Sequence, residues 1–199
     1  MREIPLLLGF AALIAFLLKT LVAQAFYIPS ESMLGQLEID DRVVVSKIAY
    51  RLHPPRRGDI VVFDCPKTAC RLDAPEPSPG DGWQARGRRV LRDVGEGIGV
   101  VQPSTEEFIK RVVALPGETV EGRDGVVFVN GRRLIEPYLD AGTTTSTFAA
   151  VTVPAGRLWV MGDNRGNSSD SRVFGAITRS SVVGRTVFKV WPLGSASFL

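Results

Sequence analysis

The chain is poor in histidine and cysteine, and neither sign of charge dominates. Its 199 residues include one His and two Cys, and the formal net charge is +3 at pH 7. So few nitrogen and sulfur ligands argue against a structural zinc site. Lys and Arg are scattered and dense only between Arg86 and Arg92, which gives little support to nucleic-acid binding. We therefore expect neither a metal nor a nucleic-acid partner.

The scarcity of histidine also limits how a nucleophilic serine could be activated. A Ser-His-Asp triad needs a histidine within hydrogen-bond reach of the serine. The only histidine is His53, in a turn-like segment before Pro54 and Pro55, and we interpret it as a surface residue. A nucleophilic serine would therefore need another base, and serine-lysine pairs are one such arrangement.

One long apolar run is present, at the N-terminus. Between Ile4 and Phe26 the only formally charged side chain is Lys19, and a helix of this length spans roughly 30 Å, enough to cross a bilayer. A buried core helix and a cleaved leader are the alternatives, and Ala23-Gln24-Ala25 offers a small-x-small cleavage site. Because the run exceeds the roughly 7 to 15 residues of a leader core, we interpret residues 1–26 as an uncleaved transmembrane anchor.

Residues 27–199 are predicted to form one mainly β domain. With 45% hydrophobic residues, the chain can bury a substantial core. Asn130-Gly131, between two apolar runs, is the strongest hairpin signal. Between about 64 and 105 the chain is rich in Pro, Gly and Asp, which predicts a surface insertion. Segments rich in β-branched residues predict strands at 42–46, 59–63, 108–115, 125–129, 157–161 and 184–190.

Lys110 lies in one of these predicted strands. Strand alternation places it on the same face as Phe108 and Val112, with Arg111 on the opposite face. The pKa of a free lysine is about 10.4, and desolvation by apolar neighbours lowers it toward the roughly 7 to 8 that suits a general base. A lysine whose amine reaches solvent from an edge strand is the alternative.

Three blocks of polar and turn-forming residues carry a resemblance to a known family. They are Ile28-Pro29-Ser30-Glu31-Ser32-Met33, Lys110-Arg111 before Leu115-Pro116-Gly117, and the run from Gly162 to Arg172, GDNRGNSSDSR. Together they resemble the bacterial type I signal peptidases, which are membrane-anchored serine proteases that cleave leader peptides from exported proteins. Arg57 to Phe63 resembles a strand that walls the substrate cleft in that family.

The resemblance implies a role for several polar residues. Ser32 would be the nucleophile and Lys110 its general base. Ser30 would join the Ser32 backbone N–H in an oxyanion hole, which stabilises the charge of a tetrahedral intermediate. Ser168 would orient the Lys110 amine. The implied ion pairs are Asp170 with Arg172 and Asp163 with Arg111.

The resemblance also implies a cleft with two shallow pockets for small side chains, at the first and third residues before the cut. Without the resemblance, the residues that match this cleft would be assigned to the core. They are Phe26, Ile28, Met33, Leu37, Val43, Val62, Phe108 and Ile109.

The chain departs from the family pattern after the nucleophile. It has Gly35-Gln36 where the family usually has Pro-Thr, and Gly166 where Asp is common. Glycine leaves free a backbone that proline would fix. The resemblance therefore does not fix the path of the turn after Ser32.

The resemblance implies a single-pass protein of the cell membrane, with its signal-peptidase-type antiparallel β domain on the extracytoplasmic side. It would act as a monomer, without cofactor, on the signal peptides of exported preproteins, after Ala-x-Ala. In that compartment we expect Cys65 and Cys70 to form a local disulfide, with two free thiols as the alternative. Two other functions stay open: a self-cleaving repressor of the SOS type, and a membrane-anchored β domain that binds partners without catalysis.

Overall fold

The structure is a computed structural model that describes residues 7, 10, 22–66 and 107–199. Leu7 and Phe10 are helical and exposed. Most of the predicted anchor, and the predicted insertion from residue 67 onward, lie outside the described residues. Within the described part of the chain, no helix is both long enough and apolar enough to span a membrane.

Two antiparallel β-sheets contain most of the regular secondary structure of the described chain, so the prediction of a mainly β domain is confirmed. The larger sheet contains β1 (Ala23–Tyr27), β2 (Arg42–Ser46), β3 (Ile60–Asp64), β4 (Glu107–Ala114), β9 (Arg157–Met161), β10 (Ile177–Thr178), β11 (Val182–Trp191) and β12 (Ser197–Phe198). Its strand order is β1-β2-β11-β3-β4-β9-β10, and β12 pairs with β11. The smaller sheet contains β5 (Thr119–Arg123), β6 (Val126–Val129), β7 (Arg132–Arg133) and β8 (Phe148–Thr152), in the order β7-β6-β5-β8.

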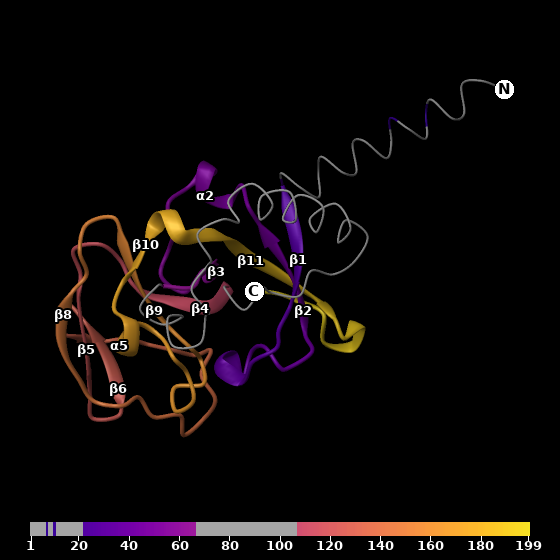
Figure 1. Ribbon diagram of the computed structural model, residues 1–199. Coiled ribbons are helices and arrows are strands. Elements are labelled where there is room, and N and C mark those ends of the chain that lie inside the picture. Colours follow the sequence, from indigo (N-terminus) through magenta and orange to yellow (C-terminus); the bar gives the residue numbers. More distant parts are fainter. Residues whose placement is uncertain (1–6, 8–9, 11–21, 67–106) are drawn as a thin grey trace, which may run out of the picture.

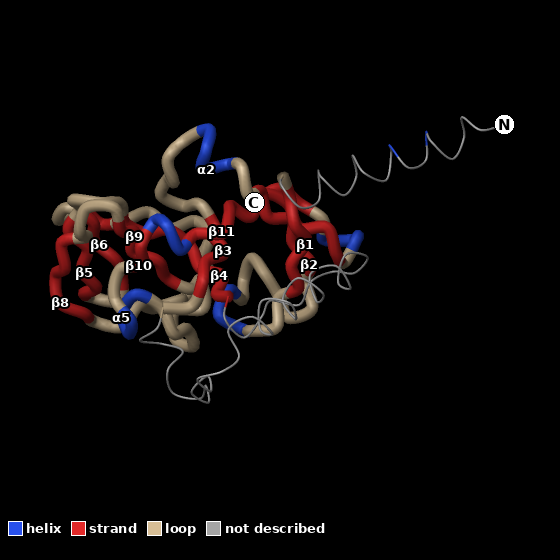
Figure 2. The backbone as a smooth tube through the Cα atoms, turned by 45° about the horizontal axis from the view of Figure 1, so that its top comes forward, coloured by secondary structure: helices blue, strands red, loops and turns tan. Residues whose placement is uncertain are grey.

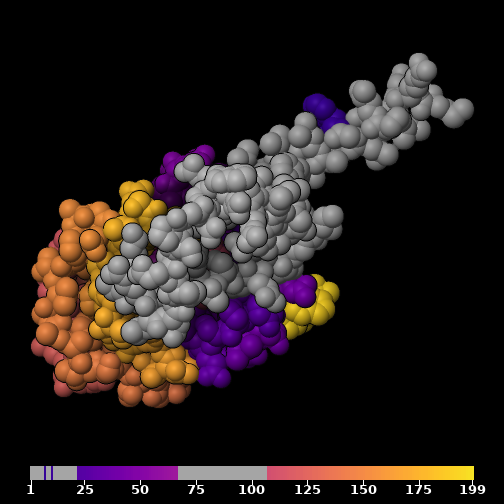
Figure 3. All heavy atoms as spheres, in the orientation of Figure 1, coloured from indigo at the N-terminus to yellow at the C-terminus, as the bar shows by residue number. Residues whose placement is uncertain are grey.

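The smaller sheet occupies one end of the domain, and the larger sheet extends from the middle to the other end. Figures 1 and 2 show β1 and β2 at one end, β5, β6 and β8 at the other, and β3, β4 and β9 between them. In the space-filling view of Figure 3, the purple residues that precede 67 lie against the yellow C-terminal residues, as the pairing of β2 with β11 requires. Short helices connect the strands: η1 (Glu31–Met33), α2 (Ala49–Leu52), α5 (Ser171–Phe174), η3 (Arg179–Ser181) and η4 (Leu193–Ser195).

All six predicted strands are present. β2 and β9 have the predicted bounds, while β3, β4, β6 and β11 differ from prediction by a residue or two at their ends. The predicted hairpin turns at Asn130 and Gly131, whose φ angles are 52° and 73°, and it joins β6 to β7. Positive φ at both central residues is what a two-residue hairpin turn of this type requires.

The predicted boundary of the anchor at residue 26 was wrong. Ala23–Tyr27 is a strand that pairs antiparallel with β2, with Ala23 opposite Ser46 and Tyr27 opposite Arg42. Phe26 is 1% exposed and belongs to the core of the domain. A continuous apolar run does not distinguish strand from helix by itself, and here the backbone of β2 supplies the partner that makes it a strand. The β domain therefore begins no later than Ala23.

One of the apolar cores lies where η1 meets the larger sheet. Its members come from β1 to β4 and from the segment around η1: Phe26, Ile28, Met33, Leu37, Val43, Val45, Ile60, Val62 and Ile109. Burial of these side chains removes about 25 cal/mol of unfavourable hydration per Å² of apolar surface. This core therefore holds η1 against β4, the two elements that carry Ser32 and Lys110.

Cys65, which follows β3, is disulfide-bonded, in agreement with the expected disulfide, while Cys70 lies outside the described residues.

His53 follows α2, where its ring contacts Tyr50 edge to face and its Nδ1 lies 2.9 Å from the Pro54 carbonyl oxygen. These local contacts fit the interpretation of His53 as a surface residue.

Candidate active site

Ser32 lies in the middle of η1 and is 8% exposed. The turn is fixed by backbone hydrogen bonds from Leu34 N to Glu31 O and from Leu37 N to Met33 O. Within the described part of the chain, the Ser32 backbone N–H has no hydrogen-bond acceptor, and Ser30 makes no side-chain cap to the helix. The hydroxyl and the backbone N–H of Ser32 are therefore held in one short, rigid turn.

Lys110 lies in β4 and reaches Ser32. Its Nζ donates to Ser32 Oγ at 2.7 Å and to the Ile109 carbonyl oxygen at 2.8 Å. The side chain passes over the ring of Phe108, with Nζ 5.4 Å from the ring centroid, so both residues face the same side of the strand, as predicted. Lys110 is 4% exposed. An amine that reaches solvent is therefore excluded.

Burial lowers the pKa of Lys110 from its ordinary 10.5 to about 8. Desolvation is the larger effect, because the charged ammonium loses its hydration in an apolar environment. The carboxylates of Asp170 and Asp163 act in the opposite direction and limit the fall. A pKa of about 8 makes the neutral amine available near physiological pH, as a general base requires.

The two accessory hydroxyls behave differently from each other. Ser30 Oγ lies 3.3 Å from Ser32 Oγ, close to the position that the resemblance implies. Ser168 Oγ is buried but has no hydrogen-bond partner among the described residues. The expected bond from Ser168 to the Lys110 amine is thus absent here, and that amine bonds to Ser32 Oγ and Ile109 O.

The loop from residue 162 to 170, here called the 162–170 loop, is attached directly to η1. Asn164 N donates to Ser32 O at 3.1 Å, and Asn164 Nδ2 donates to Glu31 O at 3.0 Å. Gly162 permits this close approach, because a Cβ at that position would lie 2.4 Å from Ser32 O and 2.2 Å from Ser168 Oγ. Any larger residue at 162 would push the loop away from the nucleophile.

Both ion pairs expected around this loop are present. Asp170 receives two bonds from Arg172, at 2.8 and 2.7 Å, and it also accepts from Gly162 N at 3.0 Å. Asp163 receives two bonds from Arg111, at 2.8 and 2.6 Å. Bidentate pairs of this kind fix geometry as well as charge. They tie the loop to itself and to β4.

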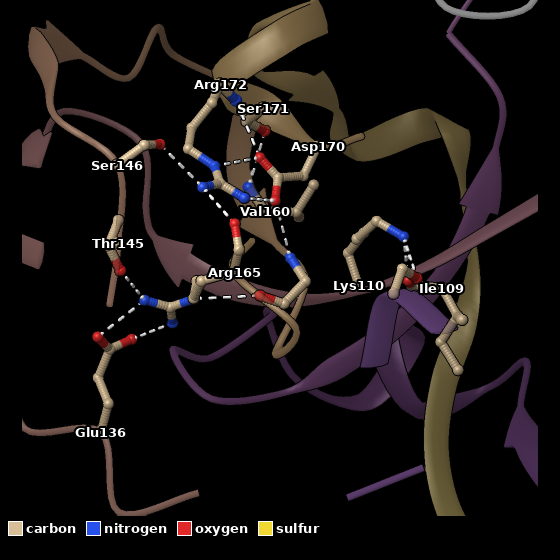
Figure 4. Close-up of polar contacts among 12 residues, drawn as sticks. Ile109, Lys110, Glu136, Thr145, Ser146, Val160, Arg165, Asp170, Ser171 and Arg172 are labelled. Atoms are coloured by element: carbon tan, nitrogen blue, oxygen red, sulfur yellow. Dashed lines mark hydrogen bonds and ion pairs between the residues drawn. The ribbon is translucent and has the colours of Figure 1, made fainter. Parts of the chain in front are cut away.

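A third buried ion pair in the same region escaped the sequence analysis. The side chain of Arg165 is fully buried and pairs with both carboxylate oxygens of Glu136. It also donates to Thr145 Oγ1 at 2.8 Å and to Gly162 O at 3.1 Å. Figure 4 shows Arg165 held between Glu136 and Thr145, with Lys110 on the opposite side of the view. This pair connects the 162–170 loop to the segment before β8.

A cleft of about 680 Å³ opens at Ser32 and Lys110. Its apolar lining includes five of the residues predicted to contact substrate: Phe26, Ile28, Val62, Phe108 and Ile109. Its polar lining includes Ser30, Glu31 and Asn167. The structure therefore brings the predicted nucleophile, its base and most of the predicted pocket residues to one place.

Three of the predicted substrate contacts are not part of this cleft. Met33, Leu37 and Val43 are fully buried in the core beneath η1 and do not line the cleft. Their contact with substrate stays a prediction, because an apolar side chain of a strand or turn matches a pocket wall and a core equally well. Their role in the structure is to support η1 from below.

The departure from the family pattern at Gly35-Gln36 has a structural counterpart. Gly35 has a φ of +105°, and a Cβ there would lie 3.0 Å from an Asp140 carboxylate oxygen. Proline, whose φ is held near about −65°, cannot adopt this conformation. Gln36 Oε1 accepts a 2.7 Å bond from Arg111 Nη2. The turn after Ser32 is thus fixed to the strand that carries Lys110.

The arrangement suits nucleophilic catalysis. A hydroxyl lies 2.7 Å from a buried amine whose lowered pKa favours its neutral form, so the amine can take the proton as the oxygen attacks a carbonyl carbon. The Ser32 backbone N–H, which has no acceptor among the described residues, and the Ser30 hydroxyl lie beside the same oxygen. An oxyanion would need donors there. Among the described residues no cluster of side chains could hold a metal ion.

Comparison with known proteins gives consistent matches. A sequence model of the family described as signal peptidase, peptidase S26, matches residues 1–191. A probable signal peptidase I-1 of Synechocystis sp. is 39% identical over 204 residues, which cover 100% of this chain and 89% of that protein. The signal peptidase I of Mycobacterium tuberculosis is 36% identical over 224 residues, which cover 96% of this chain and 73% of that protein.

Among solved structures, the chain is similar to the crystal structure of a signal peptidase I from Enterococcus faecalis. The two are 28% identical, with a TM-score of 0.43, and the match covers 66% of this chain and 95% of that one.

Proposed function

The chain belongs to the signal peptidase family, peptidase S26, as a peptidase of the signal peptidase I type, and we propose that Ser32 and Lys110 are its catalytic pair. The observation that carries this proposal is the 2.7 Å hydrogen bond between Lys110 Nζ and Ser32 Oγ. Two buried polar side chains from distant parts of the chain meet at the floor of a cleft. Family membership favours neither a self-cleaving repressor nor a non-catalytic binding domain.

The proposed reaction proceeds through an acyl-enzyme. Ser32 Oγ attacks the scissile carbonyl carbon while the Lys110 amine takes its proton. The Ser32 N–H and the Ser30 hydroxyl donate to the resulting oxyanion. Collapse breaks the C–N bond, and the Lys110 ammonium returns the proton to the leaving amine of the mature protein. The neutral Lys110 then deprotonates a water molecule, which hydrolyses the ester and frees the leader with a carboxylate.

The sheet topology supports an extended substrate in the cleft. Among the described residues, β1 is an edge strand, and Phe108 to Lys110 in β4 pair with β3 but not with β9. The cleft is lined from both strands, so a peptide could bond to an exposed strand edge. Side chains of an extended peptide alternate, which sends the first and third residues before the cut toward the apolar wall. We propose that this wall selects small residues there, as in Ala-x-Ala.

We propose that residues 1–22 anchor this domain, as a monomer, to the extracytoplasmic face of the cell membrane, where it acts on the signal peptides of exported preproteins. Lys19 is the only charged side chain between Ile4 and Val22, and Leu7 and Phe10 are exposed. The disulfide at Cys65 supports an oxidising compartment, because such bonds are rare in the cytosol of most organisms.

Two substitutions test the proposed pair in the full-length protein with a preprotein that ends its leader in Ala-x-Ala. Ser32→Ala should abolish cleavage. Lys110→Arg should do the same, because arginine keeps the cation but stays protonated at any working pH. Val127→Ala, in the core of the smaller sheet, provides a folded reference away from the cleft. Cleavage by either variant at a rate near that of the reference would show that the pair is assigned wrongly.

A further inference from the structure

We propose that Asn164 is a positioning residue that sets the direction of the Ser32 backbone N–H. The inference rests on the proposed function, because it concerns the donor that would hold the oxyanion. It adds a residue to which the sequence analysis gave no role.

Asn164 holds both carbonyl groups that flank the nucleophile. Its side-chain Nδ2 donates to Glu31 O at 3.0 Å, and its backbone N donates to Ser32 O at 3.1 Å. One residue of the 162–170 loop thus bonds to the peptide unit before Ser32 and to the peptide unit after it. The Glu31 carbonyl oxygen also accepts from Leu34 N inside the turn, at 3.1 Å, so Asn164 supplies the contact from outside the turn. The side-chain bond can be removed by substitution, while the backbone bond survives.

The side-chain bond acts on the peptide unit that contains the Ser32 N–H. Glu31 C=O and Ser32 N–H belong to one planar trans peptide, in which the two groups point in opposite directions. When Asn164 draws Glu31 O toward the loop, the Ser32 N–H is directed away from it. That N–H has no acceptor in the described part of the chain, so it stays available. A donor on the carbonyl also polarises the peptide and strengthens the N–H as a donor.

The position requires a hydrogen-bond donor, which the side-chain amide of asparagine supplies. Asparagine carries an NH₂ group that can donate, whereas an aspartate of the same shape is only an acceptor when ionised. Opposite the Glu31 carbonyl oxygen, an aspartate would place two acceptors face to face. The loop reaches this position because Gly162 lacks a side chain that would meet Ser32 O.

The test compares Asn164→Ala and the isosteric Asn164→Asp with Asn130→Ala in the full-length enzyme. Asn130 is the matched control, because its Oδ1 accepts a 2.9 Å bond from Thr119 N in the smaller sheet, away from the cleft. The measurements are kcat and KM at the high-pH plateau, the pH profile, and the affinities for two peptides ending in Ala-x-Ala. One peptide is an aldehyde, which forms a hemiacetal oxyanion with Ser32, and the other is the cleaved carboxylate product.

We expect kcat to fall about tenfold in Asn164→Ala, less than the roughly 10² to 10³ measured when an oxyanion donor itself is removed. The KM and the affinity for the product should stay within about twofold, and the midpoint of the pH profile should not move. The affinity for the aldehyde should fall as much as kcat does, because the lost bond affects only the oxyanion of the transition state. Asn164→Asp should lose at least as much at its plateau, and its fit in the same space keeps the test open if the alanine variant does not fold.

Unchanged kcat in both Asn164 variants relative to Asn130→Ala would overturn the inference. A parallel loss of aldehyde and product affinity would also overturn it, since that pattern shows a general loosening of the cleft. If the wild-type protein formed no adduct with the aldehyde at Ser32, the proposed function itself would fail. The two failures are therefore distinguishable.

Discussion

Lys110→Met should inactivate the enzyme and yet stabilise the fold at neutral pH. Methionine has nearly the same length, is apolar, and suits the environment of Phe108 and Ile109 that the buried lysine occupies. The lysine is retained in this position at a cost to stability, because its pKa in the folded chain lies below its ordinary value. Removing the ionisable group removes that cost.

The magnitude follows from the shift in the pKa of Lys110 from 10.5 to about 8. At about 1.36 kcal/mol per pKa unit, this shift lowers the free energy of unfolding by about 3 kcal/mol. The full cost applies at any pH at which the lysine is protonated in both the folded and the unfolded chain. Two hydrogen bonds of the amine are lost, at about 1 kcal/mol each. The net gain for Lys110→Met at pH 6.5 is therefore about 1 to 2 kcal/mol.

The pH dependence gives the sign of the effect. Below pH 8 both states of the wild type hold the proton, and the whole cost is present. Between pH 8 and 10.5 the unfolded state binds more protons than the folded state, so the stability of the wild type rises with pH. The advantage of Lys110→Met should therefore shrink by about 2 kcal/mol between pH 6.5 and 9.5.

Urea unfolding of both proteins at these two pH values measures the difference directly. Other titrating groups are shared by the two proteins, so their contributions cancel in the comparison. A methionine variant that is less stable than the wild type at pH 6.5, or a stability difference that does not change with pH, would refute the account of Lys110 as a desolvated amine.

Two further predictions concern the support of the site. Arg165→Met should lower the free energy of unfolding by about 3 to 5 kcal/mol, because it leaves the buried Glu136 carboxylate without its cation. In urea unfolding, the double variant Arg165→Met with Glu136→Leu should lose less than Arg165→Met alone. Equal losses in the single and the double variant would contradict this account. A chain that begins at residue 22 should stay folded and leave the membrane fraction, whereas one that begins at residue 28 should lose β1 and unfold. Equal folding of the two chains, measured by circular dichroism, would contradict the role given to β1.

The sequence was most informative where a pattern is local. The strands β2 and β9 follow from runs of apolar and β-branched residues, and the turn at Asn130-Gly131 follows from its two residue types. The strand β5 was missed although Asp124-Gly125, which joins it to β6, has the same positive φ angles of 53° and 77°. The signal was present there, but the alternating Thr119–Arg123 strand before it is short and polar.

Long-range partners were predictable only through the family resemblance. The Arg111–Asp163 pair joins residues 52 positions apart, and no spacing rule would connect them. Arg165 and Glu136 form an equally buried pair without any local signal, and the pair was missed. For Phe26, the local signal was present but misleading. An apolar residue at the end of an apolar run fits a helix, and only the pairing of β1 with β2 makes it a strand residue.

The pH dependence of Ser32 acylation tests the central claim most directly. In a single-turnover experiment with a leader peptide ending in Ala-x-Ala, the acyl-enzyme is trapped by acid and located by mass spectrometry. If neutral Lys110 is the base, the acyl group should be found on Ser32, and its rate of formation should rise through an apparent pKa of about 8 and then level off. An acyl group on another residue, or a rate that rises only near the pKa of free lysine at about 10.4, would contradict the Ser32–Lys110 mechanism.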